Sequence, residues 1–171
     1  ILGSSERATG NPEKAIECFG STLALRPDFS LCRIELCRLL FERGHVHEAR
    51  QVVSAGIAIE PDSADLHYYL GNLHHEAREL DEAVSCFERA LSISPNYAEV
   101  YGNLANSLQE RGDLDRAVDC ARKALQLQPG VEAAQNNLLF ALNYHPDKSA
   151  QEIFAAYSEY DERVGLALRS T

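Results

Sequence analysis

The sequence predicts an all-α fold, a solenoid of stacked helical hairpins that are each 34 residues long. Four classes of residue recur with this period and stay in phase, which chance does not produce. Within each period, apolar residues are spaced three and four apart, as one face of a helix requires. The recurring residues are Pro27, Pro61, Pro95 and Pro129; Ala15, Ala49, Ala83 and Ala117; Gly10, Gly44 and Gly112; and Leu2, Leu36, Leu70, Leu104 and Leu138.

Each period holds two helices, and their ends carry separate signals. A glycine at the break between them, such as Gly44 or Gly112, supplies left-handed backbone, and Asp113 can cap the helix that follows. The proline ends the second helix, because the residue before a proline is pushed out of the helical region. The expected helices span residues 1–9, 12–25, 30–43, 46–59, 64–77, 80–93, 98–111, 114–127, 132–143 and 150–168.

The end of the chain departs from the repeat. Residues 132–143 begin one more first helix, but a longer turn follows at residues 143–148. Ser149 and Glu152 then form a capping box, and the helix that they open carries one apolar stripe. Such an atypical unit is expected as the cap of a solenoid. The stripe consists of Ile153, Tyr157, Tyr160, Val164 and Leu168.

The alternation of small and large residues within a period resembles the tetratricopeptide repeat. The unit that matches best contains Leu70, Gly71, Ala83, Phe87, Ala90 and Pro95. The resemblance implies a right-handed solenoid with a truncated first repeat at residues 1–29, three full repeats at residues 30–131, and a partial repeat with a capping helix at residues 132–171. The departures are Arg33, His67 and Gln135 in place of aromatic residues, Arg78 in place of the glycine between helices, and Gly56 in place of an alanine.

A second resemblance concerns the stretch from Asn137 through Tyr157. It is similar to the segment that joins the repeats to the catalytic region in bacterial relatives of the O-linked N-acetylglucosaminyl transferases, which use a nucleotide sugar. The resemblance implies that the chain is the acceptor-recognition part of such an enzyme, with the catalytic halves following Thr171. Because the chain starts at Ile1 without an initiating methionine, we expect it to be cut from something longer.

Charge and cysteine content argue against several function classes. The formal net charge is -10 and every repeat-length segment is net acidic, so nucleic acid and anionic membrane surfaces are not expected partners. No apolar run reaches the roughly 20 residues of a membrane span. Five cysteines without a Cys-x-x-Cys pair argue against a disulfide framework and a zinc site. We therefore expect a soluble, cytoplasmic protein.

Candidate binding residues follow from helical geometry. At about 100° per residue, the second, sixth, ninth and thirteenth positions of each first helix point away from its core and line the concave groove. Asparagines recur in register at these positions, and Glu42, Glu76 and Glu110 form an acidic file. The candidate peptide-binding residues are Arg38, Tyr69, Asn72, Glu76, Asn103, Asn106, Glu110 and Asn137.

Amide side chains both donate and accept, so they can pair with the peptide groups of any extended chain. Each such bond contributes roughly 0.5 to 1.5 kcal/mol, which predicts weak, sequence-tolerant binding, with the glutamates favouring basic partners. In the transferase family the matching asparagines form a ladder that holds acceptor polypeptides, and this carries over to Asn103 and Asn137 but fails at Glu35 and Tyr69. A clamp for C-terminal carboxylates is not expected, because Arg38 is the one cation at these positions. The alternative is that these polar residues only solvate an exposed helix face.

No catalytic site, metal site or cofactor is expected. His67 and His74 share a helix face, but they fall at core positions and no further ligand completes a tetrahedral set. Cys18, Cys86 and Cys120 recur at repeat spacing, as small packing residues do. The sequence has no phosphate-binding loop and no nucleophile elbow.

Two functions from different classes follow. The first is a protein-interaction module that binds extended polypeptide, as part of a glycosyltransferase. The alternative is a self-associating assembly scaffold or adaptor with no linked enzyme, because the truncated first helix would expose core residues such as Leu2 for end-to-end contacts. An enzyme in its own right ranks last.

Overall fold

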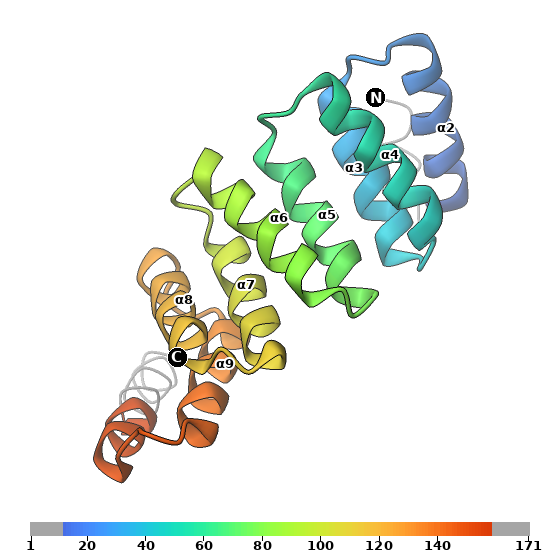
Figure 1. The fold of residues 1–171 in the computed structure, drawn as a ribbon. Coiled ribbons are helices and arrows are strands. Elements are labelled where there is room, and N and C mark those ends of the chain that lie inside the picture. The colour runs from blue at the N-terminus through green and yellow to red at the C-terminus, as the bar shows by residue number, and fades with distance from the viewer. Residues whose placement is uncertain (1–11, 159–171) are drawn as a thin grey trace, which may run out of the picture. The chain divides into compact units, whose positions relative to one another are not determined.

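Helices make up all the regular structure that the computed structural model describes, which covers residues 12–158 (Figure 1). They follow in order as α2 (Pro12–Leu25), α3 (Ser30–Glu42), α4 (Val46–Ile59), α5 (Ala64–Glu76), α6 (Leu80–Ile93), α7 (Ala98–Arg111), α8 (Leu114–Leu127) and α9 (Glu132–Tyr144). Residues 150–158 are also helical. None of the helices described is long and apolar enough to cross a membrane.

The predicted all-α solenoid is confirmed, and the predicted ends of α2 to α9 agree with the structure to within one residue. The expected helix at residues 1–9 and the end of the expected helix at 150–168 lie outside the described residues. Leu2 lies there too, so end-to-end self-association stays a prediction, as does the division into repeats at residues 29 and 131.

Residues 1–95 form the first of two compact units. Within it α3 packs against α2, α4 and α5, and α5 packs against α4 and α6. Two of the recurring alanines, Ala49 in α4 and Ala83 in α6, are fully buried. Beside Ala83, the Phe87 ring fills the space between α5 and α6 and is itself fully buried.

Residues 96–171 form the second unit, in which α7, α8 and α9 pack against one another. Three of the five buried residues of α8 are alanines, Ala117, Ala121 and Ala124, and the other two are Val118 and Leu125. Larger side chains come from the neighbouring helices, with Leu108 and Leu142 fully buried. The buried alanines of α8 thus let both first helices of this unit approach it closely.

The turns between paired helices use left-handed backbone, as predicted for Gly44 (φ 73°) and Gly112 (φ 89°). Arg78 takes the same role with φ 62°, at the place where the sequence lacks the expected glycine. The expectation that the Asp113 side chain caps α8 is wrong. Asp113 stands at the N-cap of α8 without a side-chain cap bond, because its carboxylate pairs with Arg111 at 3.1 Å and Arg116 at 3.5 Å.

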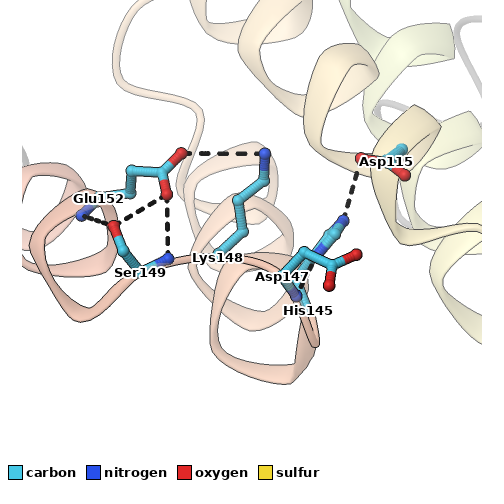
Figure 2. Close-up of polar contacts among 6 residues, drawn as sticks. All are labelled: Asp115, His145, Asp147, Lys148, Ser149 and Glu152. Atoms are coloured by element: carbon cyan, nitrogen blue, oxygen red, sulfur yellow. Dashed lines mark hydrogen bonds and ion pairs between the residues drawn. The ribbon is translucent and has the colours of Figure 1, made fainter.

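The long turn after α9 is held by two sets of polar contacts (Figure 2). His145, only 8% exposed, accepts the Asp147 N–H on Nδ1 at 3.1 Å and donates from Nε2 to Asp115 of α8 at 3.0 Å. The predicted capping box is confirmed: Glu152 accepts the Ser149 N–H at 2.9 Å, and Ser149 Oγ accepts the Glu152 N–H at 3.3 Å. The Ser149 N–H, together with the Ser149 hydroxyl that donates to the same carboxylate at 2.9 Å, holds the pKa of Glu152 below its ordinary value.

Adding one methyl group tests the close approach of α5 and α6. A Cβ on Gly71 would lie 2.5 Å from the Phe87 ring, so we expect Gly71→Ala to cost about 1 to 3 kcal/mol of unfolding free energy. Gly102 in α7 is the matched control, because a Cβ there meets nothing within 4 Å. Gly102→Ala should instead stabilise by up to about 1 kcal/mol through helix propensity. Urea unfolding midpoints that move in the same direction for both variants would contradict this packing.

Candidate polypeptide-binding faces

The candidate face of α3 is dominated by an ion-pair cluster around Arg38. Its guanidinium lies 3.0 Å from the Glu35 carboxylate and also pairs with Glu42. Partial burial disfavours the charged guanidinium, but the hydrogen bonds to Glu35 and Glu42 outweigh it and raise the pKa of Arg38. The Arg38 guanidinium is therefore already ion-paired. Glu42, one of the glutamates in the predicted acidic file, takes part in this pairing within α3.

The α5 face carries the candidates Tyr69, Asn72 and Glu76. The Tyr69 ring meets Tyr68 edge-on with centroids 5.2 Å apart. Burial, and then the neighbouring Tyr68, raise the pKa of Tyr69, so its hydroxyl stays protonated and can donate. Asn72 is only 8% exposed, which corrects the expectation that its side chain stands open, whereas Glu76 is exposed.

In the second unit, the candidates lie on α7 and α9. Asn103 and Asn106 are half-buried on α7, where Glu110 is exposed. Asn137 of α9 donates from Nδ2 to the Gly102 carbonyl oxygen of α7 at 3.0 Å. The Asn137 amide therefore ties two first helices together, and its carbonyl oxygen is the end of the side chain that this bond does not use.

Two aromatic residues on the exposed side of α9 were not among the candidates. Phe140 is 45% exposed and Tyr144 is 68% exposed, and their ring centroids lie 4.3 Å apart at an interplanar angle of 30°. They stand one helical turn apart on the same face. The sequence signal was present, because Phe140 falls at the ninth and Tyr144 at the thirteenth position of this first helix, and both are groove-lining positions.

A cavity of about 550 Å³ opens elsewhere in the second unit. Its walls come from α8, from Pro129 after it, from the helix at residues 150–158, and from Leu138 of α9. None of the candidate peptide-binding residues lines it.

The histidines and cysteines show packing and surface contacts. His67 is half-buried and donates from Nε2 to the Pro61 carbonyl at 2.9 Å, which corrects its expected place in the core. His74 donates from Nδ1 to Glu79 at 2.5 Å.

All five cysteines are free, and burial raises the pKa of Cys37 to about 12. Across residues 12–158, no group of three or more metal-ligating side chains converges.

Removal of the Asn137 amide tests its structural contribution. Asn137→Ala breaks the bond to Gly102 and should cost about 0.5 to 1.5 kcal/mol of unfolding free energy. Asn136→Ala is the control, because Asn136 is the exposed neighbour on the same helix. If thermal melts show the same loss of stability for both variants, the bond from Asn137 to Gly102 does not stabilise the packing of α9 against α7.

Family models identify the repeat. Two models described as tetratricopeptide repeat match residues 6–73 and 62–129, and together they cover well over half of the 171 residues. A comparison with curated proteins finds no match.

Solved structures share the fold. The crystal structure of MamA is 21% identical, with a TM-score of 0.84, and the match covers 96% of this chain and 97% of that one. A MamA fragment from Desulfovibrio magneticus RS-1 is 16% identical, with a TM-score of 0.82 and coverage of 94% and 90%. A mutant of the Thermobaculum terrenum O-GlcNAc transferase is 24% identical, with a TM-score of 0.70; the match covers 77% of this chain but 25% of that enzyme. At these identities the likeness concerns the fold alone. With its helical hairpins and its two matching family models, the chain belongs to the tetratricopeptide-repeat family.

Proposed function

We propose that this protein-interaction module binds extended polypeptide on the exposed face of α7 and α9. One observation carries the proposal: Asn103 and Asn137 stand one repeat apart on two helices that pack together. Because packed helices lie about 8 to 10 Å apart, amides at repeat spacing can bond to peptide groups two or three residues apart in an extended chain that crosses both helices. Because the bonds are to backbone, the side chains of the bound polypeptide matter little.

Charge sets a secondary preference for basic segments. Glu110 is exposed on the same helix as the amides Asn103 and Asn106. An exposed carboxylate attracts Lys or Arg modestly, and salt weakens the attraction. Partners with basic residues should therefore bind somewhat more tightly at low ionic strength.

The first unit contributes less to this binding. Asn72 is buried and Arg38 is paired with Glu35 and Glu42, so neither presents an open polar group. Tyr69 can donate one hydrogen bond, and Glu76 is exposed. We assign these four residues a supporting role only.

The bound polypeptides would be acceptors of a linked O-GlcNAc-transferase-like enzyme. The shared fold with the Thermobaculum terrenum O-GlcNAc transferase and the resemblance of residues 137–157 to the linking segment of that family support this step. The coding sequence beyond Thr171 tests it. A glycosyltransferase domain there supports the link, and a stop codon removes it while leaving peptide binding intact.

Substitution of the α7 amides tests the binding face. We expect Asn103→Ala with Asn106→Ala to weaken binding across most of an array of unrelated extended peptides, by about two- to ten-fold for each bond lost. Fluorescence anisotropy gives the affinities, and Asn136→Ala serves as the surface control. Equal binding by wild type and the double variant would place the site elsewhere.

A further inference from the structure

The cavity of about 550 Å³ in the second unit has the size and the walls of a small-molecule site. Such sites commonly measure about 300 to 1,000 Å³ and are lined mostly by apolar side chains. Leu125 and Leu138 belong to the core of the unit, since they are only 7% and 6% exposed. The apolar walls come from three segments of the chain and consist of Leu125, Pro129, Leu138, Ala155 and Ala156.

Small side chains on one wall leave room for a ligand. The helix at residues 150–158 lines the cavity with Ala155, which is exposed, and Ala156, which is half-buried. Water can therefore reach the apolar walls. Transfer of apolar surface out of water is favourable, so an apolar molecule that fills the cavity would be stabilised there.

Two polar side chains of α8 lie at the opening of the cavity. Arg122 and Gln126 both line it, are both exposed, and stand one helical turn apart on the same face of α8. Among the residues that the structure describes, neither side chain has a hydrogen-bond or ion-pair partner. A guanidinium can donate two parallel hydrogen bonds to a carboxylate, and a glutamine amide can donate one more.

Glu152 supplies the one carboxylate among the lining residues described, and its charge is already compensated (Figure 2). It accepts hydrogen bonds from the Ser149 N–H and hydroxyl, both at 2.9 Å, and lies 3.9 Å from the Lys148 ammonium. The bonds from Ser149 are the main cause of the lowered pKa of Glu152, and the charges of Lys148 and Arg122 lower this pKa further. Arg122 thus acts on Glu152 through space without an ion pair, and its donors remain available.

We propose that this cavity binds an aliphatic carboxylic acid, with its chain against the apolar walls and its carboxylate on Arg122 and Gln126. A neutral apolar molecule would leave the guanidinium without a partner, and a cation would meet it with like charge. A phosphate dianion would suffer more than a carboxylate from the nearby charge of Glu152. The site is separate from the polypeptide face of α7 and α9, so neither proposal depends on the other.

Binding of matched acids and amides to the whole chain tests the proposal. We expect octanoate to bind about two- to five-fold more tightly than octanamide, which has the same chain without the charge, in titration calorimetry at low salt. Decanoate should bind more tightly than octanoate, by up to about four-fold for each methylene that the cavity covers.

Three substitutions test the lining residues. Arg122→Gln should reduce the affinity for octanoate to that for octanamide. Glu152→Gln keeps the capping box and removes the opposing charge, so it should raise the affinity for octanoate by about two-fold. Ala155→Leu fills the cavity from an exposed helix position and should weaken the binding of both ligands at least five-fold.

Matched controls separate the site from general effects. Lys123→Gln removes a charge from the next residue of α8, which is not among the described residues that line the cavity, and should leave the affinity for octanoate unchanged. Circular dichroism melts verify that each variant is folded.

The outcomes that would overturn the proposal are distinct. If wild type binds neither octanoate nor octanamide, the cavity is not a site for aliphatic ligands. If wild type binds both equally, the carboxylate has no partner at Arg122. If Lys123→Gln weakens octanoate binding as much as Arg122→Gln does, the charge of the helix as a whole attracts the acid and the assigned site is wrong.

Discussion

The close approach of paired helices at small side chains is the constraint on which the rest of the structure depends. Ala83 is fully buried where α5 and α6 meet, and Gly71 faces the Phe87 ring at a distance that admits no side chain. In the second unit the buried alanines of α8 play the same part. Because such contacts recur every 34 residues, the repeat in the sequence becomes a repeat of hairpins in space.

This packing also decides which face of a first helix is available for binding. On α9, the core takes up the face that carries Leu138, Leu139 and Leu142, which leaves Phe140 and Tyr144 on the opposite side. Asn137 lies at the boundary of the two and bonds across to α7. A polar residue at such a boundary can stabilise the stack and still offer its oxygen to a ligand. In the proposed function, Asn137 would therefore couple stability to recognition.

Over residues 12–158 the helices could be predicted nearly completely from the sequence, whereas the candidate site could be predicted only as positions. Period and apolar spacing are properties of the chain itself, so helix ends such as those of α8 follow directly. The hydrogen bonds, ion pairs and burial of a polar side chain depend on neighbours in space that the sequence pattern does not specify. Asp113 forms ion pairs with two arginines and does not cap α8 with its side chain. His67 forms a hydrogen bond to a backbone carbonyl outside the core, and Asn72 is buried. The helices that carry these residues were predicted correctly, but their burial and contacts depend on neighbours in three dimensions.

The two units show how one scaffold can carry different surface chemistry at equivalent positions. The sixth position of the first helix is Glu35 in α3, where it pairs with Arg38, and Asn103 in α7. The ion pair is charged on both sides and lies within one helix, whereas an amide is neutral and has both a donor and an acceptor. Neither choice disturbs the core, because the small residues that fix the crossing lie on the other face. Surface residues of the repeat can thus change singly, and binding chemistry can be confined to one part of the chain.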